Sequence, residues 1–291
     1  MNQHDSTQTD TARGLTLAIA SVFCFAMTSI LLSHLNSAYG VDSWVASAYR
    51  SIVGLVFIFA MQRKTGKLQF AHIFSNCLLF VRGLVGGATI PLYYICIMEL
   101  GPGRASMIGG TYPLFAAVFA VFFLREGLKR NYFIYSALAL IALVMMFAEK
   151  DSGDGKLFYN ILAIIGAALG GLCVVMIRHL RLSETTSTIF ASQCVFTFII
   201  TVLVAGNRLI ISDLQALAFA LLAAITVVGG QLTLTESFRH INVVKGSTLQ
   251  MLTPALTVFL SGLIIGEHFS ILELTGGAVI FFASCQIVRS R

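Results

Sequence analysis

Apolar stretches of membrane-spanning length follow one another along almost the whole chain. A helix of about 20 apolar residues is long enough to cross a bilayer. Ten such stretches are expected, at residues 14–35, 43–61, 74–98, 104–124, 132–148, 158–177, 185–205, 214–235, 244–266 and 270–288. The segments between them are short, which leaves no room for a separate soluble catalytic domain. The predicted fold class is therefore an all-α polytopic membrane protein.

Composition and charge agree with a membrane location. Apolar residues make up 57% of the 291 residues and charged residues only 11%, whereas soluble domains carry about 25% charged residues. This excludes a cytosolic enzyme, a secreted disulfide scaffold and a nucleic-acid-binding protein. Most of the 19 Lys and Arg residues fall in segments on the same side as the N-terminus. The positive-inside rule then predicts a multi-pass protein of the inner cell membrane with both termini in the cytoplasm.

The two halves of the chain resemble each other at an offset of 141 residues. Residues 100–126 align without a gap on residues 241–267, so that Pro113 meets Pro254 and Glu126 meets Glu267. Each unit contains five expected spans, and because five is odd the second unit enters the membrane in the opposite orientation. Inverted repeats of this kind are common in secondary transporters, which bind substrate near the midplane between the halves.

The chain resembles the EamA-type members of the drug/metabolite transporter superfamily in one long segment, LYYICIMELGPGRASMIGGTYPLFAAVFAVFFLREGLKRNYF. The shared pattern is an aromatic and small-residue helix, a short turn, a small-residue helix with a central Pro and a terminal Glu. Residues 235–267 repeat it, and the Arg82-Gly83 pair also fits. Two departures are a missing glycine at the start of the fifth span and the Arg before Glu126.

The resemblance implies ten transmembrane helices in two inverted five-helix repeats around a central cavity. The corresponding division is a polar cytoplasmic tail at 1–13, a first repeat at 14–148, an outer linker at 149–157, a second repeat at 158–288 and a cytoplasmic tail at 289–291. The resemblance also implies a homodimer contact through the fifth and tenth spans.

Polar side chains inside the spans are the candidates for substrate binding, because such groups are costly in lipid. The candidate residues are Gln250, Thr111, Tyr112, Gln231, Gln193, Tyr94, Thr28 and Arg50. Amides suit a zwitterionic ligand, because they both donate and accept hydrogen bonds. Two alternatives remain open: the threonine hydroxyls can bond to their own helix, and Tyr94 can belong to an interfacial aromatic belt.

Pro113 and Pro254 are expected to kink the fourth and ninth spans. A proline inside a helix frees the carbonyl of residue i−4, here Gly109 and Gln250. Such carbonyls can face a cavity. The alternative is that the prolines only bend the helices for packing.

Four charged residues lie within the expected spans or at their ends. Arg50 lies about 10 Å below the outer surface and is either a structural charge or a partner for a substrate carboxylate or phosphate. Arg82 is expected to anchor the cytoplasmic interface. Glu126 and Glu267 end paired helices, where a negative charge is unfavourable to the dipole. They are possible gating residues or hydrated helix ends.

Rival classes lack their characteristic residues. The six His are dispersed near span ends without an HExxH motif, so we expect no enzyme, no bound metal and no cofactor. A channel would show charged rings or a filter loop. Because no Asp or Glu occupies the middle of a span, facilitated diffusion or exchange is favoured over a carboxylate proton relay.

The partners expected are the lipid bilayer and a small-molecule substrate, without nucleic acid. The predicted function is secondary transport by alternating access, with export of amino acids or related zwitterionic metabolites. The alternative is uptake or exchange of a larger metabolite such as S-adenosylmethionine, which the resemblance suggests.

Overall fold

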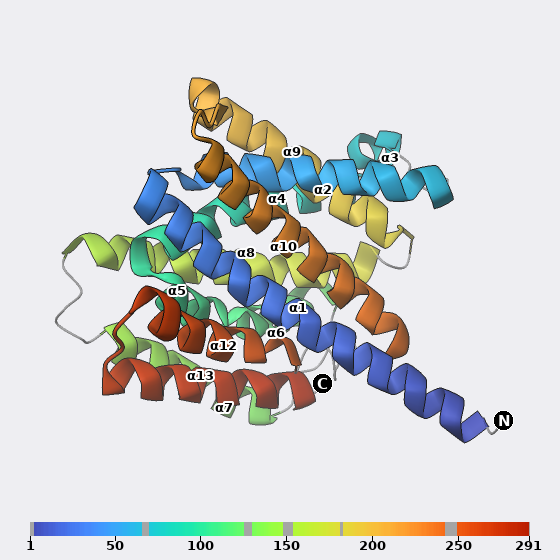
Figure 1. The fold of residues 1–291 in the computed structure, drawn as a ribbon. Coiled ribbons are helices and arrows are strands. Elements are labelled where there is room, and N and C mark those ends of the chain that lie inside the picture. Colours follow the sequence, from blue (N-terminus) through green and yellow to red (C-terminus); the bar gives the residue numbers. More distant parts are fainter. Residues whose placement is uncertain are drawn as a thin grey trace.

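The computed structural model describes residues 3–65, 70–124, 130–147, 154–180, 183–241 and 249–290. Within these ranges the chain forms helices and no strand. The helices are α1 (Gln3–Tyr39), α2 (Ser43–Thr65), α3 (Phe70–Ser75), α4 (Cys77–Leu100), α5 (Pro102–Gly109), α6 (Tyr112–Leu124), α7 (Arg130–Phe147), α8 (Asp154–Leu180), α9 (Thr186–Ala205), η1 (Gly206–Leu209), α10 (Leu214–His240), α12 (Leu252–Leu260), η2 (Ser261–Ile265) and α13 (Ile271–Ser290). Figure 1 shows them as one helical bundle.

Six of these helices are long and apolar enough to cross a membrane: α1, α2, α4, α8, α9 and α10. Shorter apolar helices cover Ile134–Met145, Leu252–Ile265 and Ile271–Gln286. Large apolar side chains face outward along the bundle, for example Phe122 at 76% exposure and Leu203 at 79%. An apolar exterior of this kind suits lipid, and the structure is that of a polytopic membrane protein.

Polar residues start several of the long helices. Asn76 accepts hydrogen bonds from the amides of Leu78 and Leu79 at the start of α4, and Asp213 does the same for α10. These side chains satisfy backbone donors that have no partner within the helix. Gly101, at φ +92°, turns the chain from α4 into α5, a conformation that residues with a Cβ rarely adopt.

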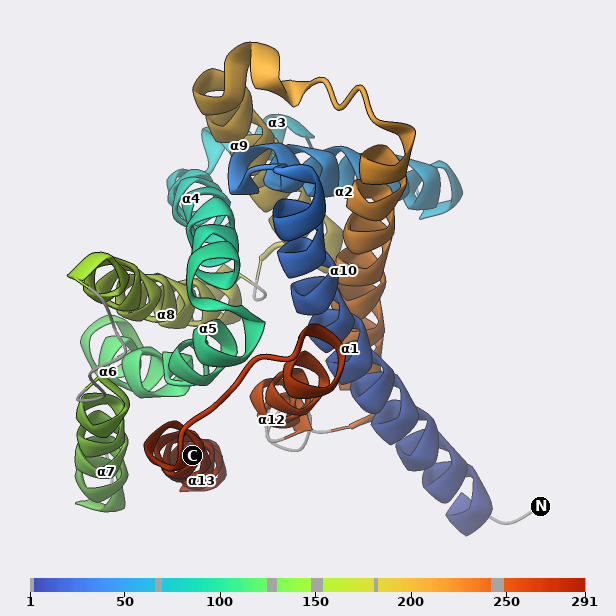
Figure 2. The same ribbon diagram turned by 60° about the vertical axis from the view of Figure 1, so that its left-hand side comes forward.

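Helices from the two halves of the sequence pack against one another. α1 lies along α10 (Figures 1 and 2), and α4 packs on α8 and α9. α2 packs on α9 and α6 packs on α8, while α7 and α13 lie side by side at one edge of the bundle. The largest buried apolar cluster includes Leu35 from α1, Ile97 from α4 and Ile280 from α13. The core is thus shared by both halves.

The expected fourth span is not one continuous helix. α5 ends at Gly109, a turn covers Gly110 and Thr111, and α6 begins at Tyr112. Pro113 therefore lies in the first turn of a new helix, where its missing N–H costs nothing, rather than at a kink in mid-helix. Pro254 likewise follows a turn at Met251, in the first turn of α12.

Candidate functional site

Two arginines are buried where α2, α4 and α9 meet. Arg50 on α2 is 6% exposed and Arg82 on α4 is 4% exposed. Arg82 donates from Nη2 to Gln193 Oε1 on α9 at 3.1 Å, and Gln193 donates from Nε2 to the carbonyl of Gly86 at 3.4 Å. The guanidinium of Arg82 and the amide of Gln193 are therefore held across the boundary between the two halves of the sequence.

Small residues make room for this arrangement. A Cβ built on Gly86 would collide with Arg82 Nη1, so the guanidinium lies directly over this glycine. A Cβ on Gly54 of α2 would come within 2.8 Å of Cys194 Sγ on α9. These glycines let the helices approach closely beside the two charges.

Neither arginine has an acidic partner among the described residues. No carboxylate in these ranges lies within ion-pair distance of either guanidinium. Arg50 Nη1 and Arg82 Nε and Nη1 are buried without a hydrogen-bond partner. Arg50 lies one turn before Gly54, on the face of α2 that meets Cys194 of α9, and is close enough to Arg82 and Tyr94 of α4 for electrostatic interaction. On insertion scales each such charge costs about 3 kcal/mol. We call Arg50, Arg82, Tyr94 and Gln193 the arginine cluster.

The prediction that Arg82 anchors the cytoplasmic interface is wrong. Its side chain is buried rather than extended to the surface. The signal available in the sequence was the run of glycines after it, Gly83, Gly86 and Gly87, because small residues on a helix admit a neighbour. A Cβ on Gly87 would lie 2.8 Å from the amide nitrogen of Thr197, which confirms this close approach of α9.

Gln250 lies in the helical residues just before α12. Its Nε2 donates to Ser21 Oγ on α1 at 2.6 Å and is 3.4 Å from the carbonyl oxygen of Ala18. Ser21 is fully buried. The amide of Gln250 thus joins the two halves through Ser21, which is not among the candidates predicted from the sequence.

Two further candidates lie on α1 and α10, and a third lies on α4. Thr28 is buried and its hydroxyl bonds both to the carbonyl of Cys24 and, at 3.0 Å, to the hydroxyl of Thr226 on α10. The expected bond to its own helix is present, but so is a contact between halves. Gln231 on α10 is half-buried. Tyr94 is buried and belongs to the arginine cluster, so it is not part of an interfacial belt.

Two more candidates, Thr111 and Tyr112, lie at the break between α5 and α6, close to both prolines. Thr111 is fully buried and its hydroxyl bonds to the carbonyl of Ile108 at 2.7 Å. The half-buried Tyr112 begins α6, and its carbonyl lies against Gly171 of α8. The carbonyl of Gly110 accepts a hydrogen bond from Ser284 Oγ at 2.8 Å, and a Cβ on Gly110 would lie 3.3 Å from Pro254 Cγ. The two helix breaks are in contact.

Glu267 has a partner that explains its position at a helix end. Its carboxylate accepts hydrogen bonds from the amides of Gly103 and Arg104, at 3.0 and 3.3 Å, at the start of α5. The positive end of the α5 dipole therefore compensates this charge. Arg104 also forms an ion pair with the buried Glu273 of α13. Glu126, the other possible gating residue, lies outside the described residues.

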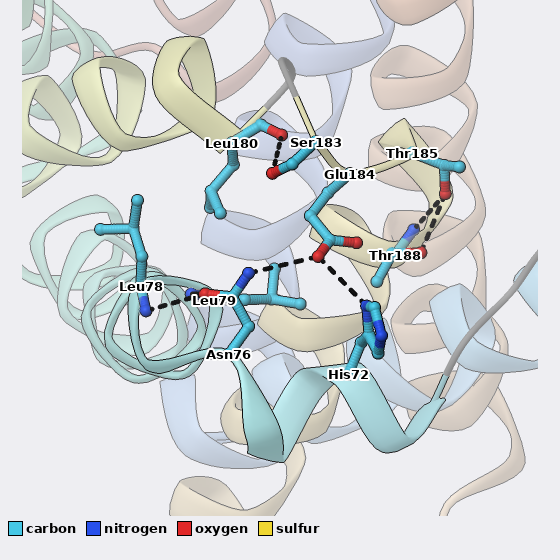
Figure 3. A network of polar contacts seen from close by, with 9 residues as sticks. All are labelled: His72, Asn76, Leu78, Leu79, Leu180, Ser183, Glu184, Thr185 and Thr188. Atoms are coloured by element: carbon cyan, nitrogen blue, oxygen red, sulfur yellow. Dashed lines mark hydrogen bonds and ion pairs between the residues drawn. The ribbon is translucent and has the colours of Figure 1, made fainter.

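Two more polar contacts join the starts of α2 and α9 to segments of the opposite half. Glu184, before α9, accepts from His72 Nδ1 at 3.3 Å and from Asn76 Nδ2 at 3.2 Å (Figure 3). Asp42, before α2, pairs with Arg208 in η1 at 2.9 Å. Each acid precedes the second long helix of its own half and pairs with a residue of the other half.

The structure thus brings the candidates together in three places rather than one. Arg50, Tyr94 and Gln193 share the arginine cluster, Thr111 and Tyr112 lie at the helix break, and Gln250 and Thr28 each join α1 to the second half. The arginine cluster is the part with unused hydrogen-bond donors. Chemically, it can bind an oxyanion.

Comparison with known proteins assigns a family to nearly all of this architecture. The profile of the EamA-like transporter family matches residues 12–148 and again residues 157–289. A solved crystal structure has the same fold, with a TM-score of 0.65 at 14% identity over 95% of each chain.

Two curated relatives carry functional names. The Pseudopaline exporter CntI of Pseudomonas aeruginosa (strain UCBPP-PA14) is 26% identical over 289 residues, covering 96% of each chain. The Solute carrier family 35 member G1 of Mus musculus is 26% identical over 180 residues, covering 57% of this chain and 48% of that protein.

Proposed function

This chain belongs to the EamA-like transporter family, and from that premise we propose that it exports a small metabolite by alternating access. The observation that carries the proposal is the Arg82–Gln193 hydrogen bond, which places polar groups from both halves at one point inside an apolar bundle. Export is the direction we propose because a relative that matches over 96% of this chain is named as an exporter.

We propose further that the fold is a ten-span inverted repeat divided between residues 14–148 and 158–288. The packing of the helices supports this, because a span of the first half and the corresponding span of the second half contact equivalent partners in the opposite half. The first span of each half packs on the third of the other, α1 on α10 and α8 on α4. The second span of each half packs on the third span of the other half, α2 on α10 and α9 on α4. The first span of each half packs on the fourth span of the other half, α1 on α12 and α8 on α6.

The broken fourth and ninth spans supply the moving parts in this proposal. Discontinuous helices in transporters place helix ends and freed backbone groups at the boundary between repeats. Here the Gly110 turn and Pro254 touch at that boundary. Rocking of one half against the other would change the contacts at this point, while the Gln250–Ser21 bond would be made or broken.

The contacts of Glu267 and Glu273 close the bundle on one side of the membrane in this proposal. Glu267 and Glu273 follow the ninth span, and their partners Gly103 and Arg104 begin the fourth. In the proposed topology, with both termini cytoplasmic in the inner membrane, these contacts lie on the outer side. The structure then corresponds to a state in which the two halves are held together at the outer surface.

We also propose a homodimer through α7 and α13. Both helices lie at one edge of the bundle (Figure 2), and apolar side chains cover their outer faces, including Ile141 at 60% exposure and Leu274 at 47%. Crosslinking of a cysteine placed at Ile141 in native membranes tests this contact.

Comparative mass spectrometry tests the transport function. Cells making this protein are compared with cells making the Gln193→Ala variant and with cells carrying an empty vector, in both medium and cell contents. We expect a metabolite, in the first instance an amino acid or a related zwitterion, that rises in the medium only with the unmodified protein. A metabolite that rises inside the cells instead would show uptake, and equal transport by both proteins would remove Gln193 from the site.

A further inference from the structure

Two permanent positive charges, Arg50 on α2 and Arg82 on α4, are buried inside an apolar bundle, and no carboxylate of the described residues pairs with them. Arg50 and Arg82 are both more than nine-tenths buried, and no acid in the described ranges pairs with either. A guanidinium does not lose its proton in a protein, so neither residue can become neutral. Buried charges are normally paired or hydrogen-bonded, and like charges repel. The arginine cluster is therefore an incomplete site.

The neighbouring groups satisfy only part of its hydrogen-bonding capacity. Gln193 Oε1 accepts one bond from Arg82 Nη2, and the other end of that amide is used by Gly86. Arg82 Nε and Nη1 and Arg50 Nη1 have no acceptor. Cys194, which lies against Gly54 of α2, and Cys173, which lies beside Gly86 and Arg82, are free thiols. Thiols are weak acceptors.

We propose that the transported metabolite is a net anion, whose carboxylate or phosphate group binds the guanidinium groups of Arg50 and Arg82. Oxyanions accept charge-assisted, bidentate hydrogen bonds from guanidinium groups, which is what the unused donors require. This proposal rests on the proposed transport function and narrows it. It also revises the substrate class, since the cluster holds no carboxylate to accept the ammonium group of a zwitterion.

The position of the cluster couples anion binding to movement of the halves. Arg50 and Arg82 belong to the first half of the chain, whereas Gln193 and Cys194 belong to the second. Both guanidinium groups are closed to water here, so an anion enters or leaves only when α4 and α9 move relative to each other. The bound anion would stabilise the closed arrangement by neutralising two repelling charges.

Thermal unfolding of the purified protein in detergent tests the binding site directly. The probes are sodium succinate and sodium phosphate, compared with sodium chloride at equal ionic strength. The proteins are the unmodified chain, Arg50→Met/Arg82→Met, and Arg208→Met as the control, because Arg208 is an exposed arginine with an acidic partner. We expect at least one probe to raise the melting temperature of the unmodified chain and of the control by about 3 °C. The double variant should not respond.

The melting temperatures without a probe separate a binding site from a structural pair of charges. Replacing unpaired buried charges by an apolar side chain of similar length removes repulsion, so the double variant should melt at a higher temperature than the unmodified chain. If the double variant melts lower and neither probe protects the unmodified chain, the proposal is wrong. Equal protection of all three proteins would also overturn it, because the anion would then bind elsewhere.

The charge of the exported metabolite distinguishes this inference from the transport function on which it rests. Anion-exchange fractionation of the medium should retain the metabolite that only the unmodified chain exports, and the double variant should not export it. Export of a zwitterion or a cation would overturn the anionic substrate and leave the transporter standing. Anion protection without export of any metabolite would support the site and contradict the transport function.

Discussion

The carboxylate of Glu267 accepts a hydrogen bond from the amide of Gly103, 3.0 Å away, and so joins the end of the ninth expected span to the start of the fourth. Gly101 lies beneath this contact: a Cβ there would come within 2.6 Å of Glu267 Oε1. The LGPGR turn thus has two reasons for its first glycine, the backbone conformation and the space that Glu267 occupies.

Removing this carboxylate should open the outer side of the transporter. Hydrogen bonds to a charged group contribute about 1.5–3 kcal/mol, so Glu267→Ala should shift the equilibrium towards the outward-open state by about ten-fold or more. The measurement is the labelling rate of a cysteine introduced at Gly109 by a membrane-impermeant thiol reagent. It requires a background in which the six native cysteines are replaced.

The control for this measurement is Glu99→Ala, which removes an exposed carboxylate from the last turn of α4. We expect no change in labelling there. Glu267→Gln should fall between the two, because an amide oxygen still accepts from the α5 amides without the charge. Equal labelling in all three variants would mean that Glu267 does not close the outer side.

Gln250 and Ser21 should be coupled in stability. The two side chains form a hydrogen bond of 2.6 Å, and Ser21 is fully buried. Such a bond contributes about 1 kcal/mol to the free energy of unfolding. A double-mutant cycle of Gln250→Ala and Ser21→Ala, read from thermal unfolding, should give a coupling energy of that size.

Transport rates of the same variants separate two roles for Gln250. If its amide binds substrate, Gln250→Ala should reduce export more than Ser21→Ala, which leaves the amide in place. If the amide only joins α1 to the segment before α12, the two variants should have equal effects on export.

The polar contacts at the two ends of the α2–α9 pair should differ in strength. The Glu184 side chain is 8% exposed and accepts from both His72 and Asn76 (Figure 3), so Glu184→Gln should lower the free energy of unfolding by about 1–3 kcal/mol. Arg208 is 61% exposed, so Arg208→Gln should cost less than about 1 kcal/mol. Similar losses in thermal unfolding would contradict the role of burial.

The class of fold could be predicted from the sequence because apolar length is a one-dimensional property. Each of the ten expected spans contains a described helix, α5 and α6 sharing the fourth, and the ninth, 244–266, is described from Leu249 onward. What the pattern could not show is that the fourth span breaks at Gly110. Pro113 is compatible with either a kink or a new helix, and the turn at Gly110 and Thr111 shows that a new helix begins there.

The site was harder to predict because burial and pairing depend on neighbours far apart in the sequence. Arg50, Tyr94 and Gln193 are candidates by residue type, yet the position of Arg82 near a span end predicts an interface residue, although its side chain lies beside them. The partners of Gln250 and Thr28, Ser21 and Thr226, are ordinary small polar residues with no pattern of their own. Only packing places them opposite a candidate.

Which glycines of α8 are in close contact with a neighbouring helix also depends on packing, and two of them allow a direct test. Gly166 and Gly170 form a GxxxG pair, a pattern typical of close helix packing in membranes, but a Cβ on Gly166 meets nothing within 4 Å. The tight position is Gly171, where a Cβ would lie 2.6 Å from the Ala116 amide nitrogen and 2.8 Å from the Tyr112 carbonyl oxygen. These are backbone atoms of α6, which cannot move aside as a flexible side chain would.

Gly171→Ala should therefore separate α8 from the helix break, whereas Gly166→Ala should not. We expect Gly171→Ala to lower the free energy of unfolding by about 1–3 kcal/mol through overpacking. Gly166→Ala should raise it by about 0.5–1 kcal/mol, because alanine is the better helix former. Thermal unfolding and export of the two variants would be compared. If both alanines are tolerated equally, α6 and α8 are not in the close contact on which the proposed movement of the halves depends.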